Sequence, residues 1–392
     1  MKINIAIGTD QNYVRQACVL MQSIMDTANR DYEYVFFILI DNDVSDNSGK
    51  QFLSFQKSYD NCHMNIIQIQ DQIIATYIRL KNITRATYYR LLLPDLLEED
   101  KCIYLDTDII VCGDIAEIYN MPMDGYVVAG VKAPTYHQFA DQGKEYMKKT
   151  GLPSMDQYIN AGVLVLDLDK LRKENYTQKA LQLIHKPLPT QDQDIINLLC
   201  YDKIKHLPFK YNVPVTYHLE KKTELIDKVF TQEEWKEGIE NPYILHFCGP
   251  LKPWEYFNVP FADRWWEACR HAGLFSDFAQ ERLEIFYYYG VILQKPLWKC
   301  EEFSKGWYEE LKKFPYIYVY GAGEKGSKLI RKLQQNNVNI EAAVVSEKDK
   351  NLSSVENVEV VEFTKHIQQS ALILLGVSVS YIREIRGKLF LE

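Results

Sequence analysis

Short apolar runs alternate along the chain with longer stretches in which apolar residues recur at helical spacing. The first runs predict strands over residues 3–7, 34–40 and 64–69, with helices over residues 15–27 and after Asp46. Alternation of this kind is typical of an α/β sheet whose strands are mostly parallel. In such sheets ligands bind at the carboxyl ends of the strands, so the residues that follow each strand are the first candidates for a site.

The pattern divides the chain into three predicted parts. Residues 1–272 carry the strand and helix alternation and form the first predicted domain. Residues 273–314 are rich in aromatic side chains and predict a helical linker that packs between domains. From residue 315 a fresh strand, glycine loop and helix lead into further strands, which predict a second, small Rossmann-like α/β domain over residues 315–392.

Composition and charge mainly exclude classes of function. A chain of 392 residues with 47% hydrophobic residues can bury a sizeable core. Its formal net charge of −8 and its lack of a basic block argue against nucleic-acid binding. In the linker, six basic side chains are balanced by five acidic ones between residues 282 and 313, so we expect membrane contact to be peripheral at most.

Cysteine usage and the N-terminal sequence predict a cytoplasmic location. The eight cysteines are scattered, with no C-x-x-C pair, which is typical of reduced thiols in a protein core. The N-terminal apolar stretch is too short for a signal peptide, and no run approaches the roughly 20 apolar residues of a membrane span. The sequence leaves a homo-oligomer open.

Two carboxylates stand one residue apart in "YLDTDII", at the end of an apolar run. On an extended strand Asp106 and Asp108 would share a face, while Thr107 would point away. Without a cation nearby, their repulsion would raise a carboxyl pKa and destabilise the strand end. Hard divalent ions such as Mg²⁺ or Mn²⁺ prefer such oxygen ligands. Because the same pair also occurs as a solvated turn, it needs further support.

That support comes from the segment "HFCGPLKPW", which follows another apolar run. His246 could serve as a third metal ligand, Gly249 allows close backbone approach, and Lys252 could place a positive charge on a phosphate. Each residue also has an ordinary structural interpretation, His246 as a buried imidazole and Trp254 as a packing residue. The ordered combination is more specific than any of its members.

These motifs resemble those of glycosyltransferase family 8, which comprises retaining enzymes of the GT-A fold that use nucleotide sugars and includes bacterial lipopolysaccharide galactosyl- and glucosyltransferases. The resemblance covers about residues 1–270. It implies a GT-A catalytic domain, a UDP-hexose donor, a glycan or glycoconjugate acceptor, and Mn²⁺ or Mg²⁺ as cofactor. The expected activity is therefore that of a hexosyltransferase.

The resemblance also implies roles for the residues that match the family's motifs. It implies that Asp106, Asp108 and His246 bind the metal, and that Asp106 also faces the donor. Lys252 would contact the diphosphate, with Gly249 alongside. The other implied residues are Asp10, Asn12 and Tyr13 at the uridine, Arg90 at the donor, Asn160, Ala161 and Gly162 at the donor sugar, and Asp192 and Gln193 beside the anomeric carbon.

One position departs from the family pattern and leaves the choice between glucose and galactose open. Lys132 stands in the neighbourhood where family members commonly place an acidic residue near the sugar. For the chemistry, retention of configuration requires a carboxylate nucleophile or attack from the face of the leaving group. Because an amide is a poor nucleophile, we expect same-face substitution, with Gln193 stabilising an oxocarbenium-like state. Asp192 would orient the sugar or, alternatively, act as the nucleophile.

A second candidate nucleotide loop lies near the C-terminus. Gly321, Gly323 and Gly326 form a G-x-G-x-x-G sequence between a predicted strand and a predicted helix, which is the context of a dinucleotide fingerprint. However, the domain is short, and Glu347 comes later than the acidic residue of that fingerprint usually lies. A dinucleotide site therefore competes with a glycine turn needed only for packing, and we favour the turn.

Two other functions use this loop and rival the transferase. A dinucleotide-dependent oxidoreductase would centre on the loop, but no catalytic His or Tyr-Lys pair lies near it, and the N-terminal motifs would be left without a use. A nucleotide-sugar sensor would use the same N-terminal residues for binding alone, with the tail recruiting partners. Release of UDP from a UDP-sugar in the presence of Mn²⁺ distinguishes the three.

Overall fold

The computed structural model of the chain divides into two compact units, which are described separately. The first comprises Met1–Cys248 and Asp263–Leu274, and the second comprises Gly249–Ala262 and Phe275–Glu392. The structure describes residues 1–70, 84–133, 140–218, 229–249, 251–255, 259–278, 308, 311–312, 314–346, 353–362 and 371–375.

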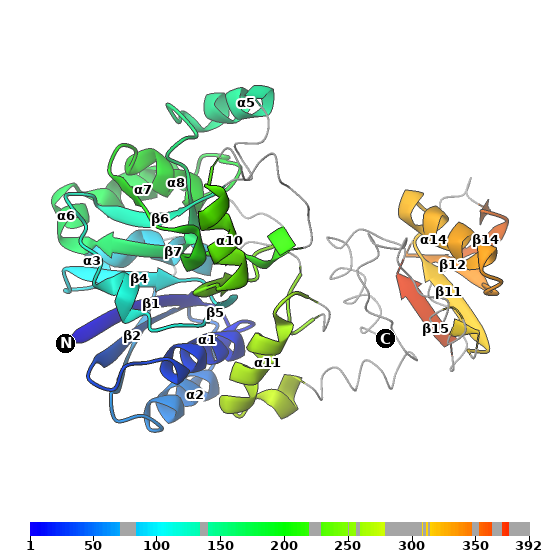
Figure 1. The fold of residues 1–392 in the computed structure, drawn as a ribbon, viewed down its shortest axis with the longest axis horizontal. Coiled ribbons are helices and arrows are strands. Elements are labelled where there is room, and N and C mark those ends of the chain that lie inside the picture. Colours follow the sequence, from blue (N-terminus) through cyan, green and yellow to red (C-terminus); the bar gives the residue numbers. More distant parts are fainter. Residues whose placement is uncertain are drawn as a thin grey trace. The chain divides into compact units, whose positions relative to one another are not determined.

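A seven-stranded sheet forms the centre of the first unit (Figure 1). In sheet order its strands are β3 (Cys62–Gln68), β2 (Glu33–Ile40), β1 (Lys2–Thr9), β4 (Lys101–Leu105), β7 (Ile159–Asp167), β6 (Val128–Lys132) and β8 (Ile204–His206). The first four strands are parallel, β7 is antiparallel to both of its neighbours, and β8 is parallel to β6. The predicted α/β sheet with mostly parallel strands is confirmed.

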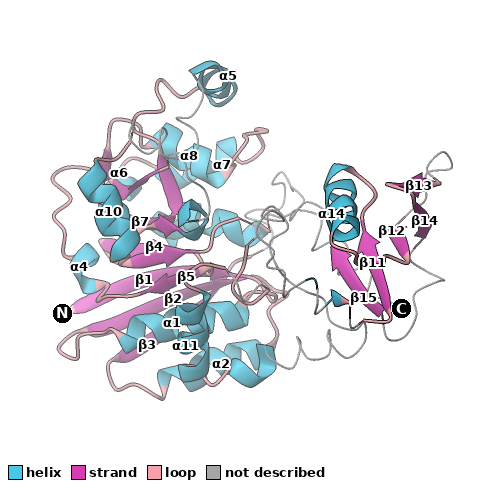
Figure 2. Cartoon of the chain, turned by 45° about the vertical axis from the view of Figure 1, so that its right-hand side comes forward, coloured by secondary structure: helices cyan, strands magenta, loops and turns pink. Residues whose placement is uncertain are grey.

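Apolar side chains cover both faces of this sheet, because the strands are hydrophobic at nearly every position. Ile5 and Phe36 pack into the core beneath α1 (Val14–Asp26), whereas Ala6 and Phe37 point to the opposite face. The views in Figure 1 and Figure 2 place α1 and α2 (Asp46–Gln56) on one side and α6, α7 and α8 on the other. The result is a three-layer arrangement with the sheet in the middle.

The remaining helices before residue 272 are mostly short. They are α3 (Leu93–Leu96), α4 (Ala116–Tyr119), α5 (Ala140–Thr150), α6 (Leu168–Lys173), α7 (Tyr176–Leu183), α8 (Asp192–Leu199), α10 (Gln232–Glu240), α11 (Ala262–His271) and the 3₁₀ helices η1 (Arg85–Leu92), η3 (Phe209–Tyr211) and η4 (Val215–His218). Within the described ranges no helix is long and apolar enough to cross a membrane. The seven described cysteines all carry free thiols.

A second, smaller sheet contains the strand that follows β4 in the chain. Its order is β5 (Ile109–Val111), β10 (Ile244–His246) and β9 (Val213–Pro214). β10 is antiparallel to β5 and parallel to β9, and the register pairs Ile109 with His246. Three segments that are far apart in the sequence are therefore brought together at the carboxyl end of β4.

The second unit contains a five-stranded sheet. Its order is β13 (Ser354–Val355), β14 (Val358–Glu362), β12 (Ala342–Val345), β11 (Tyr316–Tyr320) and β15 (Ala371–Leu375). Apart from the β13–β14 hairpin, all neighbouring strands are parallel. The helix α14 (Glu324–Gln335) buries Leu329 and Leu333 in one core with Val319 of β11. The strands and helix predicted here are present, whereas most of the predicted linker, residues 273–314, lies outside the described residues.

Candidate functional site

The two aspartates of the D-x-D motif occupy a turn between two sheets. The expectation that they share one extended strand is wrong, because β4 ends at Leu105 and β5 of the smaller sheet begins at Ile109. The backbone has to turn where the chain leaves one sheet for the other. Its ends are fixed by hydrogen bonds, since Asp106 N donates to Gly162 O at 2.9 Å and Phe247 N donates to Asp108 O at 2.8 Å.

His246 completes a three-residue cluster with these carboxylates, as the sequence predicted. Its Nε2 lies 3.2 Å from Asp108 Oδ1 and 3.9 Å from Asp106 Oδ2. One ligand atom from each of the three residues falls within 4.8 Å of the others. Two carboxylate oxygens and an imidazole nitrogen are a donor set that several divalent metal ions accept. The residues present therefore fit a divalent ion.

Gly162 leaves the space that this cluster needs. A Cβ built on Gly162 would lie 2.2 Å from His246 Cε1 and 2.9 Å from Asp106 Oδ2. Real Cβ atoms do not approach other atoms so closely, so any other residue here would displace the imidazole or the carboxylate. A glycine at position 162 is thus required by the packing of the cluster itself.

Asn212 and Asn160 hold His246 in one orientation. Asn160 Oδ1 accepts the backbone N–H of Gly162 at 2.9 Å, which fixes its amide oxygen on that side. Asn212 Nδ2 donates to the same oxygen at 2.8 Å, so Asn212 Oδ1 faces His246 Nδ1, at 2.9 Å. Nδ1 therefore donates to Asn212, and Nε2 is the ring nitrogen that faces the carboxylates and could bind a metal. The sequence analysis did not identify Asn212, whose only signal is its place directly before β9.

Arg90 neutralises part of the negative charge around the cluster. Its Nη2 donates to Asp106 Oδ1 at 2.6 Å, its Nε lies 3.0 Å from Asp192 Oδ2, and Nη1 donates to Ala161 O. Tyr104 Oη also donates to Asp106 Oδ1, at 3.1 Å. One oxygen of Asp106 is therefore held by Arg90 and Tyr104, while the other faces His246.

Asp192 is buried beside this guanidinium. Burial raises the pKa of Asp192 to about 7, and the positive charge of Arg90 opposes that rise. Three carboxyl groups, those of Asp106, Asp108 and Asp192, are thus gathered around the single guanidinium of Arg90. A divalent cation would offset negative charge on these groups.

Gln193 lies against the segment Asn160–Gly162, and its place beside the anomeric carbon stays a prediction. Its Oε1 accepts from Asn160 Nδ2 at 3.2 Å and from Ala161 N at 3.0 Å, and its Nε2 donates to Tyr158 Oη at 3.2 Å. The next residue, Asp194, is fully buried, and its Oδ1 accepts from Tyr158 Oη at 2.6 Å. Asp194 was not predicted as a site residue, although it stands only two residues after Asp192 in the sequence.

Asp10, Asn12 and Tyr13 follow β1 at the same sheet edge. Register pairing of Ile7 with Leu105 puts Asp10 and Asp106 at the carboxyl ends of neighbouring parallel strands. Asp10 Oδ1 accepts the backbone N–H of Asn12 at 2.9 Å, and Tyr13 stands at the start of α1. Asp10 thus forms a local turn after β1, and a uridine contact stays a prediction.

The remaining predicted residues fall outside this cluster. Gly249 has a φ of +82°, which favours glycine, and Lys252 Nζ lies 5.7 Å from the ring centroid of Trp254. Both Gly249 and Lys252 belong to the second unit, so a diphosphate contact stays a prediction. Lys132 ends β6 in the first unit.

The glycine loop of the second unit is a strand-to-helix turn. Gly321 directly follows β11 with a φ of +109°, and Gly323 is the N-cap of α14. Gly326 is buried inside α14. The first turn of α14 carries Glu324, whose carboxylate pairs with Lys328 at 2.7 Å. An acidic side chain at a helix N-terminus does not favour a phosphate there.

The sequence was compared with known families and structures. The model of glycosyl transferase family 8 matches residues 4–258. The chain belongs to this family. Membership confirms the predicted enzyme class, a glycosyltransferase, for the first unit.

Individual relatives agree with the family assignment. The lipopolysaccharide 1,2-glucosyltransferase of Escherichia coli (strain K12) is 30% identical over 263 residues, which are 66% of this chain and 74% of that protein. General stress protein A of Bacillus subtilis (strain 168) is 25% identical over 281 residues, 67% of this chain and 94% of that protein. The galactosyltransferase LgtC, solved with donor and acceptor sugar analogues, matches 69% of this chain and 95% of its own with a TM-score of 0.57 and 22% identity. This likeness supports the GT-A-like α/β fold.

Proposed function

We propose that this family 8 enzyme is a divalent-metal-dependent, retaining hexosyltransferase that moves glucose or galactose from a UDP-sugar to a glycan or glycoconjugate. The observation that carries the proposal is the convergence of Asp106, Asp108 and His246 within 4.8 Å. Segments from two sheets supply these residues, and Gly162 leaves room for their approach. The glucosyltransferase and galactosyltransferase among the relatives support a hexose as the transferred group.

The metal would supply Lewis acidity for the leaving diphosphate. Asp106 Oδ2, Asp108 Oδ1 and His246 Nε2 would hold it, and the Asn212 contact keeps the imidazole ring turned so that Nε2 is directed at the site. Lys252, by resemblance, would add a positive charge near the phosphates. These residues bind and orient the donor without needing a covalent step.

Gln193 is arranged for electrostatic stabilisation. Two donors, Asn160 Nδ2 and Ala161 N, hold its Oε1, so the amide dipole is oriented before the donor arrives. Asp192 is ion-paired with Arg90 and only 4% exposed, which makes it a weak nucleophile. Both arrangements favour same-face substitution, in which a leaving phosphate oxygen takes the acceptor proton.

The test is a donor and acceptor screen with the full chain. We expect UDP release from UDP-glucose or UDP-galactose, and we expect this release to require Mn²⁺ or Mg²⁺. NMR of the product should show that the anomeric carbon keeps the α-configuration of the donor. Activity that is unchanged after chelation would refute the metal requirement. Binding of the UDP-sugar without UDP release, whichever acceptor is added, would favour the sensor. Turnover of NAD(H) would favour the oxidoreductase. A cytoplasmic location, a homo-oligomer and peripheral membrane contact stay predictions.

A further inference from the structure

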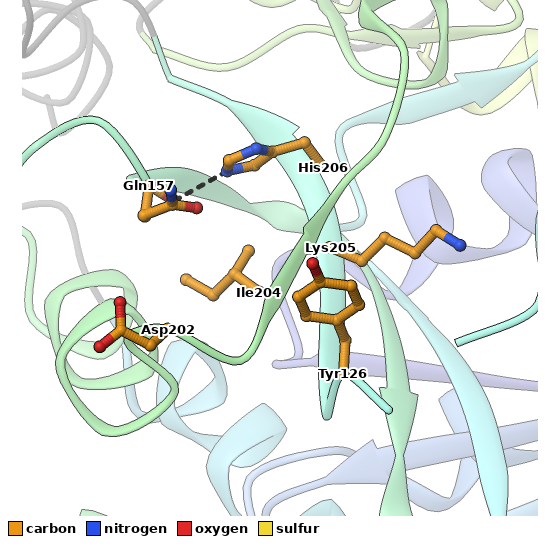
Figure 3. Close-up of a pocket in the computed structure, with 6 residues that line it drawn as sticks. All are labelled: Tyr126, Gln157, Asp202, Ile204, Lys205 and His206. Atoms are coloured by element: carbon orange, nitrogen blue, oxygen red, sulfur yellow. Dashed lines mark hydrogen bonds between the residues drawn. The ribbon is translucent and has the colours of Figure 1, made fainter. Parts of the chain in front are cut away.

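A separate cavity lies along the outer edge of the main sheet (Figure 3). Its volume is about 400 Å³, and β8, the outermost strand, forms one side of it. None of its lining residues belongs to the Asp106–Asp108–His246 cluster or to the residues that contact it. The lining residues are Tyr126, Gln157, Asp202, Ile204, Lys205 and His206.

The lining combines an aromatic ring with uncommitted polar groups. Tyr126 is 38% exposed, one of the few large apolar side chains that the described surface exposes to this extent. Buried Ile204 supplies apolar surface beside it. Among the described residues, no hydrogen bond engages the Tyr126 hydroxyl, the side-chain amide of Gln157 or the carboxylate of Asp202. These groups can therefore bind a ligand without breaking an internal contact.

Among the six lining residues, no cation is directed into the cavity. Side chains alternate along β8, so Ile204 and His206 share one face while Lys205 points to the other, as Figure 3 shows. Lys205 Nζ donates to Pro122 O at 2.5 Å and pairs with Asp124. Burial lowers the pKa of His206, and the charge of Lys132, which does not line the cavity, lowers it further. The ring is therefore neutral, and because its Nε2 contacts Gln157 O at 3.3 Å, Nδ1 is left as an acceptor.

This chemistry selects against an anion and in favour of a sugar. The carboxylate of Asp202 would repel a phosphate or another anion, and neither Lys205 nor His206 offsets it. A neutral polyol instead presents hydroxyl groups to carboxylate, amide and imidazole, and an apolar ring face to tyrosine. The lining is more polar than that of a typical small-molecule pocket, which suits a ligand rich in hydroxyl groups better than an apolar one.

We propose that this cavity is a saccharide subsite that holds the glycan chain of the acceptor at a distance from the reacting end. The inference rests on the proposed transferase function for its biological use. Three strand steps separate β4 from β8, a span of about 14 Å at the usual strand spacing. Gln157 directly precedes Tyr158, whose hydroxyl accepts a hydrogen bond from Gln193, so the chain that lines the cavity continues directly to the proposed catalytic residues.

Saccharide binding to the full chain, without donor, tests the subsite. The probes are lactose, maltose and N-acetyllactosamine, followed by saturation-transfer NMR and titration. We expect at least one sugar to bind, and Tyr126→Ala to weaken it about tenfold through loss of the ring face. Asp202→Asn should weaken it less, and it should fold, because asparagine tolerates the left-handed φ of +64° at this position. Leu53→Ala is the control, since Leu53 is 49% exposed on α2, which packs against β3 at the opposite sheet edge.

Each outcome bears on the subsite separately from the transferase. If none of the three sugars binds, or if binding is unchanged in both Tyr126→Ala and Asp202→Asn, the subsite is refuted. Binding of inorganic phosphate that Asp202→Asn strengthens would also overturn it. UDP release from the donor in water, measured on the same variants, reports the catalytic centre. Loss of sugar binding with intact UDP release supports the subsite, whereas a wild-type chain without UDP release contradicts the transferase proposal alone.

Discussion

The D-x-D turn and the C-terminal glycine loop begin alike and end differently. Both follow the carboxyl end of a strand that pairs in parallel with a neighbour, where α/β sheets bind ligands. Around Asp106 and Asp108, polar side chains converge from distant segments, including Arg90 and His246. Within the part of the chain that the structure describes, the hydrogen bonds of the glycine loop come from its own unit, and its helix begins with an acidic residue.

The difference shows what separates a site from a turn. A strand end supplies a position, but side chains from other segments supply the chemistry. Around Asp106 and Asp108, several carboxyl groups, an imidazole held by Asn212, and the space left by Gly162 occur together. At the glycine loop, the backbone conformation of Gly321 accounts for the glycine without a ligand. The following variants break or sharpen this contrast, in order of expected effect.

The largest effect should come from removing a proposed metal ligand. Asp108→Asn keeps the shape of the side chain but removes a negative charge, so we expect UDP release to fall by about a thousandfold. Stabilisation of the fold by Mn²⁺ in a thermal melt should disappear with it. Asp31→Asn, at an exposed carboxylate, is the matched control. Wild-type Mn²⁺ dependence in Asp108→Asn would contradict the metal assignment.

A methyl group at Gly162 should disable the cluster without changing any ligand. Because its Cβ would lie 2.2 Å from His246 Cε1, Gly162→Ala should weaken Mn²⁺ binding by about a hundredfold and reduce UDP release in proportion. Gly49→Ala is the control, because nothing lies within 4 Å of a Cβ at that position. Titration of Mn²⁺ measures the effect directly. Equal affinities in the two variants would show that the close approach of Gly162 does not matter.

Asn212 should have a smaller effect, since it acts on the metal through His246. Asn212→Ala removes the acceptor for Nδ1–H and should lower Mn²⁺ affinity by about 10- to 100-fold. Asn212→Asp keeps that acceptor but places an oxygen against Asn160 Oδ1, so its affinity should fall between alanine and wild type. A purely structural role would instead lower the melting temperature of both variants without changing Mn²⁺ affinity.

The sequence predicted the residues that follow strands better than the residues that orient them. Apolar runs directly precede or follow Asp106, Asp108 and His246, so the sequence predicts that these residues lie at strand ends. The turn at the two aspartates could not be predicted, because one strand and two strands joined by a turn give the same apolar pattern. Asn212 acts through a residue 34 positions away, and Asn160 through one 52 positions away. Pairings of that range arise only from the fold.

The fold shows the same limit in the second unit. Apolar runs near residues 341–345, 358–361 and 371–376 predict the strands β12, β14 and β15, with ends within about two residues, the usual uncertainty of such boundaries. The hairpin of β13 and β14 was missed. Its two turn residues, Glu356 and Asn357, both have positive φ, which Asn-Gly or Asp-Gly would have signalled. Glu-Asn does not carry that signal.

The smallest effect on catalysis should come from the glycine loop, and two of its glycines differ in a way that tests its role. Gly321→Ala forces alanine to a φ of +109° and should destabilise the second unit by about 1 to 3 kcal/mol. Gly323→Ala should be tolerated, because its φ is −81° and nothing lies within 4 Å of its Cβ. UDP release should be unchanged in both, and calorimetric titration of the full chain with NAD(H) should give no binding. Binding that Gly323→Ala abolishes would instead make the loop a nucleotide site, because only a bound pyrophosphate would need that open space.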